Sequence, residues 1–415
     1  MDSFLLKSLL LIEPAHPLHQ KRVDIRIKNG VIIEINEVLE TTTTESVIDL
    51  NGYFVSGGWF DPEVALSEPG FESKGRLMDD LNTIAESGCT HIGLLPNFDP
   101  VPDKGSVVSY FSQFNSHPTR IINYGTLSKA SNGEDLAELY DLSQSGTSVF
   151  YDYKKDILNT SLMKLALQYT QPFKGVVGVF ACDGYLKGKG VALEGVTSTR
   201  LGLKAIPAIA ESIRIQRDLE LLRYTGGKLH FLNISTPESV SLIRNAKSEG
   251  LNVTASVSIA QLYFNDTALE EFEGRYKLLP PLSNKTTQKV LLDALLEGTI
   301  DFIGSDHYNC STEEKNVEFD LAEFGARSNE HLFAALTELV GYGTACELLQ
   351  RPFTFFGLEK PTVDHGSVAT LSFFRKEPYR VTEKEPQTEL FFGQQFDYKA
   401  QGIFSNGKLH LKTTH

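Results

Sequence analysis

The sequence predicts an α/β protein in which a (β/α)8 barrel is joined to a small β-sandwich built from both ends of the chain. Eight short apolar runs, most of them followed by a stretch of helical periodicity, lie between residues 53 and 306. Residues 1–52 and 358–415 instead alternate strand-like runs with turns. Because 415 residues exceed the roughly 250–300 at which a single core stops growing, we expect two domains: 1–52 with 358–415, and 53–357.

The terminal segments predict the strands of the sandwich. At the amino end the expected strands are 8–12, 23–27, 31–35 and 46–50. Lys28-Asn29-Gly30 between the second and third reads as a hairpin turn. At the carboxyl end we expect strands within 368–374 and 403–411, the latter turning at Ser405-Asn406-Gly407. The two termini together therefore supply one β layer.

The central segment predicts the barrel. The expected strands are 54–60, 91–95, 121–124, 148–151, 176–180, 229–232, 253–257 and 300–304. The expected helices are 75–87, 134–143, 158–169, 207–223, 237–249 and 288–297. Candidate helix caps are Ser235-Thr236, which precede a first-turn proline, and Thr286-Thr287. Eight such strand–helix units are typical of a TIM barrel.

Composition and charge exclude several classes of function. A net charge of −14 disfavours a nucleic-acid surface, and no run of about 18 apolar residues predicts a membrane span. The four cysteines lack the paired spacing of a zinc cluster or a disulfide framework. We therefore expect a cytoplasmic protein, and we expect it to form a homo-oligomer.

The carboxyl ends of the barrel strands are where catalytic residues of such a fold would lie. The expected ends offer Glu63, Asp152, Asn233 and Asp306-His307. His307 supplies the one imidazole among them, and His230 is predicted to face the helices by strand alternation from Asn233. This set is poor in metal ligands.

Several segments resemble motifs of type I dihydroorotases, in the amidohydrolase superfamily. The stretch SGGWFDPEVALSEPG at 56–70 is similar to the family signature PGxIDxHxHxREPG. Further similarities are LPNFDP at 95–100, TRLGLKAIPA at 199–208, LHFLNIST at 229–236, SDH at 305–307, EEK at 313–315 and FDLAEFG at 319–325. The resemblance implies a barrel of the metal-dependent hydrolase type.

The resemblance also implies a reaction and a set of metal ligands. Dihydroorotases use two divalent metals to open dihydroorotate reversibly to carbamoyl aspartate. The family's four metal-binding histidines fall on Glu63, Ala65, Phe180 and Asn233, its bridging carboxylate on Asp152, and its general base on Asp306. Alanine and phenylalanine supply no donor atom. We therefore expect no cofactor, and zinc or another divalent ion only if Glu63, Asp152 and Asp306 hold it.

The residues that would contact the substrate are largely replaced as well. The family's carboxylate-binding arginine falls on Ser67, an asparagine on Leu279 and a later histidine on Cys310. Asn97 is retained, and His307 is a second candidate substrate contact. Serine cannot replace the bidentate pair that a guanidinium makes with a carboxylate.

Three hypotheses remain open at this stage. In the first, the chain is a non-catalytic dihydroorotase homologue whose surface binds a partner protein, and the family suggests aspartate carbamoyltransferase as that partner. Alternatively it is a cyclic-amide hydrolase with an atypical or single-metal site, or a small-molecule binding module.

Two further segments carry local expectations. We interpret 154–156 as a solvated loop, and the aromatic stretch 389–398 as either an interaction patch or interdomain packing.

Overall fold

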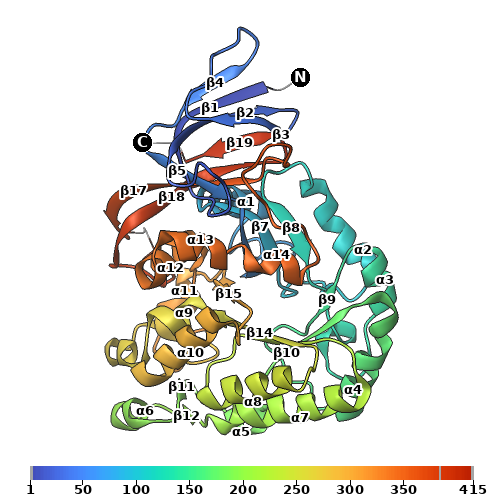
Figure 1. The fold of residues 1–415 in the computed structure, drawn as a ribbon. Helices are drawn as coiled ribbons and strands as arrows, with labels where there is room; N and C mark the ends of the chain where they lie inside the picture. The colour runs from blue at the N-terminus through green and yellow to red at the C-terminus, as the bar shows by residue number, and fades with distance from the viewer. Residues whose placement is uncertain (1–2, 383–384, 413–415) are drawn as a thin grey trace.

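The computed structural model describes residues 3–382 and 385–412, and the central part of these is a barrel of parallel strands (Figure 1). In chain order its eight strands are β6 (Trp59–Ala65), β7 (Cys89–Leu94), β8 (Arg120–Asn123), β9 (Val149–Phe150), β10 (Val176–Phe180), β13 (Leu229–Leu232), β14 (Val253–Ser258) and β15 (Phe302–Gly304). The strand pairing follows the same order.

Two contacts link the two sheets into a closed ring. A parallel bridge from Gly125 to Phe150 joins the end of β8 to β9. On the other side, the Asp61 carboxylate of β6 accepts the backbone N–H of Ser305, just after β15, at 2.9 Å. A short strand, β16 (His307–Tyr308), then pairs with β6. The carboxyl ends of all eight strands are thus held at one mouth.

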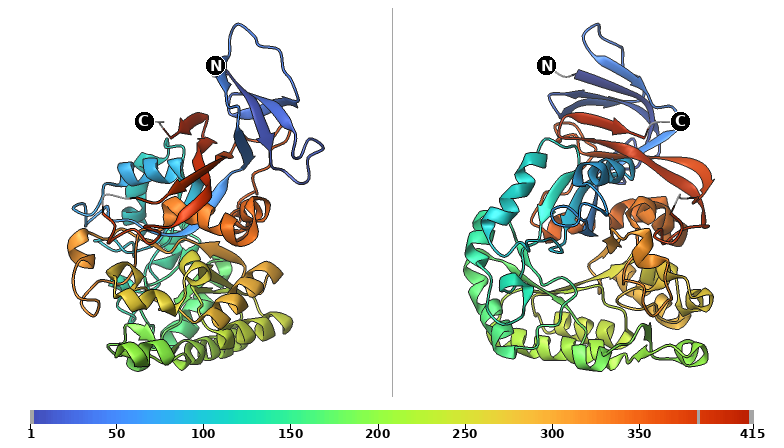
Figure 2. Two further views of the ribbon diagram at one scale, coloured as in Figure 1. Left: turned by 90° about the vertical axis from the view of Figure 1, so that its left-hand side faces the viewer. Right: turned by 180° about the vertical axis from the view of Figure 1, so that it is seen from behind.

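Helices surround the barrel (Figure 2). The main ones are α1 (Leu77–Glu86), α3 (Leu139–Gln144), α4 (Thr160–Tyr169), α7 (Ile209–Thr225), α8 (Pro237–Ser248), α10 (Lys285–Glu297) and α12 (Leu332–Val340). Thr236 caps α8 as predicted, whereas α10 is capped by the Asn284 side chain and not by Thr286 or Thr287. The prediction for α10 was wrong because the Asn284 carboxamide reaches two first-turn amides.

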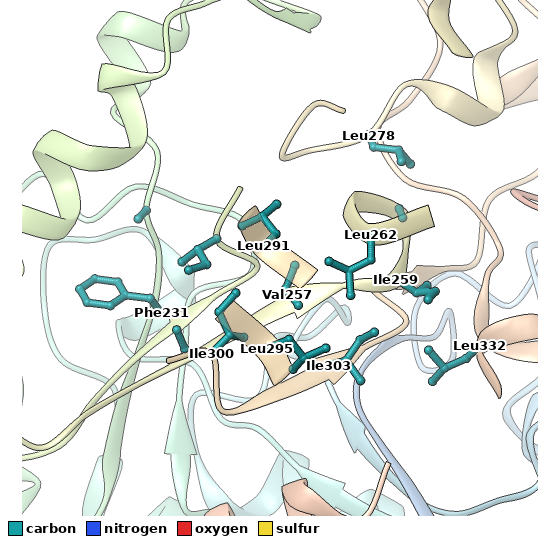
Figure 3. Close-up of a cluster of buried hydrophobic side chains, with 14 of the residues drawn as sticks. Phe231, Val257, Ile259, Leu262, Leu278, Leu291, Leu295, Ile300, Ile303 and Leu332 are labelled. Carbon is teal, nitrogen blue, oxygen red and sulfur yellow. The ribbon is translucent and has the colours of Figure 1, made fainter. Parts of the chain in front are cut away.

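Apolar side chains of strands and helices fill the space between the two layers. Phe231 and Val257 from the strands pack in one buried cluster with Leu291 and Leu295 from α10 (Figure 3). Burial of such side chains contributes roughly 1.5–3 kcal/mol each. This cluster fixes the strands that carry the candidate site.

The two ends of the chain build one eight-stranded sheet. Its order is β19-β18-β17-β5-β1-β2-β3, with β4 beside β1. The strands are β1 (Ser3–Leu11), β2 (Arg22–Lys28), β3 (Val31–Asn36), β4 (Ser46–Asp49), β5 (Tyr53–Gly57), β17 (Leu371–Arg380), β18 (Gln395–Ser405) and β19 (Lys408–Leu411). Side chains from both ends form a single core, which is the predicted β-sandwich. Figure 1 shows these strands together at one end of the molecule.

The expected strand 54–60 is in fact two strands in different domains. β5 pairs with β1 and β17 of the sandwich, whereas β6 starts the barrel. Gly58 separates them, and a Cβ on Gly57, the last residue of β5, would lie 2.3 Å from the Pro361 carbonyl oxygen. Only glycine permits this close backbone approach. The prediction missed the break because the apolar run continues through it.

Trp59 joins the two domains just after this break. Its ring stacks on Phe333 with centroids 4.1 Å apart, and its indole N–H donates to Ser56 Oγ at 2.9 Å. Phe374 of β17 packs against the same ring at 5.9 Å. The barrel and the sandwich therefore share an aromatic contact.

In the described part of the chain, no helix combines the length and apolar character needed to cross a membrane.

Candidate functional site

Three side chains reach the barrel mouth from residues with left-handed backbone conformation. Lys154, Asn233 and Asp306 have φ angles of 50°, 54° and 51°, and each follows the end of a barrel strand. Residues other than glycine rarely adopt this conformation, which costs of order 1–3 kcal/mol. The fold holds these three residues there through surrounding contacts.

Lys154 and Asp306 form an ion pair at the centre of the mouth. Lys154 Nζ lies 2.8 Å from Asp306 Oδ2, and the two side chains are only 10% and 8% exposed. Burial raises the pKa of Asp306 to about 6, although the lysine charge opposes this shift. The interpretation of 154–156 as a solvated loop is therefore wrong for Lys154, whereas Lys155 is exposed as expected.

The loop that carries Lys154 is anchored from both sides. The Lys154 backbone N–H donates to the Tyr151 hydroxyl at 2.7 Å, and the Asp156 carboxylate pairs with Arg214 of α7 at 2.6 Å. These contacts turn Lys154 inward. Its position two residues after Asp152, a strand-end residue, was the signal in the sequence that could have placed it at the mouth.

Glu63 lies fully buried in the barrel interior. Its Oε1 accepts a hydrogen bond from Ser256 Oγ, and its Oε2 has no hydrogen-bond partner within the described residues. Burial raises the pKa of Glu63 to about 7, while the Ser256 hydrogen bond and the Lys154 charge act against the shift. Ser256 was not predicted as a site residue, because it lies on β14 and meets Glu63 only in the closed barrel.

His230 faces the barrel interior and not the helices, so its predicted orientation was wrong. Its Nε2 lies 4.0 Å from Glu63 Oε1, and its Nδ1 lies 2.9 Å from Thr254 Oγ1. The error arose because strand alternation was counted from Asn233, whose left-handed backbone breaks that alternation. Burial lowers the pKa of His230 to about 3, so the ring is neutral.

Asp152 is bound by the loop that follows β8. Its carboxylate accepts the backbone N–H groups of Leu127 at 2.9 Å and Ser128 at 3.0 Å, and also the Ser128 hydroxyl. Both carboxylate oxygens are thus engaged by the neighbouring loop. Burial raises the pKa of Asp152, with these hydrogen bonds opposing. The structure therefore does not bring Asp152 to Glu63 and Asp306 as a third ligand.

His307 is held by the protein through both ring nitrogens. Nδ1 accepts the backbone N–H groups of Ser328 and Asn329, each at 3.2 Å. Nε2 therefore carries the proton and donates to Asn309 Oδ1 at 2.9 Å, and the Asn309 amide donates to Asp80 at 2.7 Å. Burial lowers the pKa of His307 to about 4. These bonds leave no ring nitrogen for a substrate.

The replaced family positions take part in packing. Ala65, Phe180 and Leu279 belong to one buried apolar cluster with Tyr124 and Tyr151. Cys310 is also buried, with its Sγ 3.9 Å from the Thr388 carbonyl oxygen. The mouth of the barrel is therefore closed by apolar and aromatic side chains around the Lys154–Asp306 pair.

A cavity of about 360 Å³ lies outside this closure. Asn97 and Ser67 line it together with Lys155, Tyr153 and Tyr308, whereas Lys154, Glu63 and Asp306 do not. The Asn97 amide donates to the Leu66 carbonyl at 2.9 Å, and its Oδ1 has no partner within the described residues. Asn97, the expected substrate contact, and Asp306, the expected general base, therefore do not line the same cavity.

Comparison with known proteins identifies the family. A family model described as dihydro-orotase-like matches residues 53–239. A dihydroorotase from Pelotomaculum thermopropionicum is 34% identical over 378 residues, which cover 89% of this chain and 88% of that protein. Another, from Ruminiclostridium cellulolyticum, is 35% identical over 411 residues, covering 93% and 95%. This chain belongs to the dihydroorotase family.

Solved structures of similar fold are hydantoinases. The L-hydantoinase from Arthrobacter aurescens superposes with a TM-score of 0.81 at 20% identity, covering 99% of this chain and 96% of that one. A D-hydantoinase gives a TM-score of 0.80 at 19% identity, covering 99% and 95%. At this level of identity the likeness shows the fold alone. It confirms the predicted barrel with a β-sandwich.

Family membership corrects the expectation that no cofactor is involved. Dihydroorotases are typically dinuclear zinc enzymes, so the family implies a metal centre at the barrel mouth. As arranged here, the side chains do not fit such a centre. Asp306 is paired with Lys154, Asp152 is bonded to backbone amides, and Phe180 offers no donor. Within the described ranges, no three His, Cys, Asp or Glu side chains are grouped to hold an ion.

Proposed function

We propose that this member of the dihydroorotase family does not open dihydroorotate and instead serves as a structural partner in pyrimidine biosynthesis. The observation that carries the proposal is the ion pair between Lys154 Nζ and Asp306 Oδ2 at 2.8 Å. The resemblance assigns Asp306 the role of general base, which must accept a proton from the reacting groups. Here a buried ammonium occupies one oxygen of that carboxylate.

The surroundings of this pair support the same proposal. The cavity that Asn97 lines does not include Asp306, so a ligand in it would not reach the carboxylate. Ser67 replaces the arginine that the family uses for the substrate carboxylate, and a hydroxyl cannot form a bidentate ion pair. Substrate binding and proton transfer are thus both weakened.

A cyclic-amide hydrolase of altered chemistry is the second candidate. It is favoured by three buried oxygen atoms near the mouth that lack hydrogen-bond partners within the described residues, Glu63 Oε2, Asn233 Oδ1 and Asp306 Oδ1. Such acceptors are usually satisfied in native proteins. In this reading Lys154 would have to leave Asp306 before any reaction.

Turnover of dihydroorotate and of carbamoyl aspartate, measured with zinc supplied, separates the two candidates. The Pelotomaculum thermopropionicum dihydroorotase in the same assay is the positive control. We expect no turnover above background. Turnover that disappears in the Asp306→Ala variant would overturn the non-catalytic proposal.

The partner is tested separately, and aspartate carbamoyltransferase from the same organism is our candidate. Mixing the two purified proteins and measuring the mass of the complex by light scattering is expected to give a stoichiometric assembly larger than either component. The absence of such a complex would overturn the choice of partner and leave the proposal of a non-catalytic protein standing. Measurement of this protein alone tests the expected homo-oligomer.

A further inference from the structure

A second cavity lies away from the barrel mouth, at the junction of the two domains. It has a volume of about 810 Å³ and lies where the β17–β18 hairpin of the sandwich faces α12 and the start of α13 (Tyr342–Leu348). Figure 1 shows this junction beside the barrel helices. Binding sites are common at such domain interfaces, and the volume is in the usual range for organic ligands.

Aromatic rings form the walls of this junction cleft. Tyr379, Phe396 and Tyr398 line it from the hairpin, and Tyr342 lines it from α13. The centroids of Tyr342 and Tyr398 are 5.4 Å apart, and those of Tyr379 and Phe396 are 5.8 Å apart. Aromatic faces attract cations through the ring quadrupole, and the Lys399 ammonium already lies 5.1 Å from the centroid of Tyr379.

The charged side chains of the cleft favour a positive ligand. Glu338 and Asp397 contribute carboxylates and Arg380 a guanidinium, so one negative charge is in excess among the lining groups. Glu338 is exposed, and its Oε2 accepts the Tyr263 hydroxyl at 2.9 Å. Thr337, also in the lining, is 7% exposed, and its hydroxyl has no hydrogen-bond partner within the described residues.

We propose that the junction cleft binds a small organic ammonium compound with a flat ring, the ring lying among the four aromatic side chains and the ammonium facing Glu338. The site is separate from the barrel mouth, because Lys154, Glu63 and Asp306 do not line it. A ligand in the cleft would contact both the β17–β18 hairpin of the sandwich and the barrel helices α12 and α13, and would therefore connect the two domains.

Isothermal titration calorimetry of the full chain with tyramine tests the proposal. We expect saturable binding that weakens about tenfold in Glu338→Gln, because a charge-assisted contact becomes a neutral one. Glutamine still accepts the Tyr263 hydroxyl, so this variant should fold. Tyr342→Leu, which removes one aromatic wall, is expected to weaken binding as well.

Two matched controls make the outcome decisive. 3-(4-Hydroxyphenyl)propionate has the same ring with a carboxylate in place of the ammonium, and we expect it not to bind. Glu238→Gln removes an exposed carboxylate in the first turn of α8, away from the cleft, and should leave tyramine binding unchanged. No saturable tyramine binding, equal binding of the propionate, or unchanged binding in Glu338→Gln would overturn the proposal.

Discussion

Lys154 and Asp306 are 152 residues apart in the chain, yet their side chains meet at 2.8 Å at the mouth of the barrel. Each follows a strand end and each has a left-handed backbone. The lysine charge also acts on the buried Glu63, whose pKa it lowers against the effect of burial. The predictions below follow from this arrangement and from the packing around it.

Replacing Lys154 by methionine is expected to destabilise the protein by about 3 kcal/mol, because breaking a buried ion pair leaves an uncompensated charge. The double variant Lys154→Met with Asp306→Asn should recover most of this loss. Urea unfolding at pH 8 measures both. Lys155→Met is the control, since Lys155 is exposed and bonds to the Ser131 carbonyl. Equal stability of Lys154→Met and the parent protein would show that the pair is not a structural element.

Glu63→Gln is expected to stabilise the protein at pH 8 and to have little effect at pH 4. The pKa of Glu63 in the folded protein is about 7, above its ordinary value of 4.5, so folding favours the protonated form. Stability is therefore lost as the pH rises from about 4.5 through 7, and glutamine removes this loss. The expected gain at pH 8 is on the order of 2 kcal/mol. Unfolding curves that show the same difference between variant and parent at both pH values would contradict the raised pKa.

Phe180→Ala tests whether the barrel mouth is a packed core. Phe180 is 3% exposed and lies in the apolar cluster with Ala65 and Leu279. Truncation should cost about 3–5 kcal/mol, as for other buried phenylalanines. Tyr185→Ala, at a position 83% exposed, should change the free energy of unfolding by less than about 0.5 kcal/mol. A loss in Phe180→Ala no larger than that of the control would mean that the mouth is loosely packed.

His307→Leu is expected to destabilise the protein by about 2–3 kcal/mol. The substitution leaves the buried amides of Ser328 and Asn329 without their acceptor. Because the folded pKa of His307 is about 4, below its ordinary 6.5, the parent also loses stability as the pH falls from 6.5 towards 4, and the variant should lack this component. Thermal unfolding between pH 4 and 7 measures both effects. A parallel pH profile in variant and parent would contradict a neutral buried His307.

Part of the candidate site could be predicted from sequence and part could not. Glu63 and Asp306 were selected because strand ends of a barrel converge, and in the structure both are buried and lie close enough to Lys154 for its charge to lower the pKa of each. The orientation of Asp152 could not be predicted, since it depends on two backbone amides of another loop. His230 was misplaced because one left-handed residue, Asn233, interrupts the alternation on which the prediction relied.

The sequence by itself determined the barrel, the sandwich from both termini and the family, because apolar periodicity and motif order survive in the linear chain. Only the tertiary structure decided that Lys154 pairs with Asp306, that Ser256 bonds Glu63, and that Asn97 lies in a separate cavity. These contacts join residues far apart in sequence through closure of the barrel and through local backbone conformations. The apolar periodicity of the sequence does not predict barrel closure contacts or local backbone conformations, so only the folded structure shows which side chains meet at the mouth.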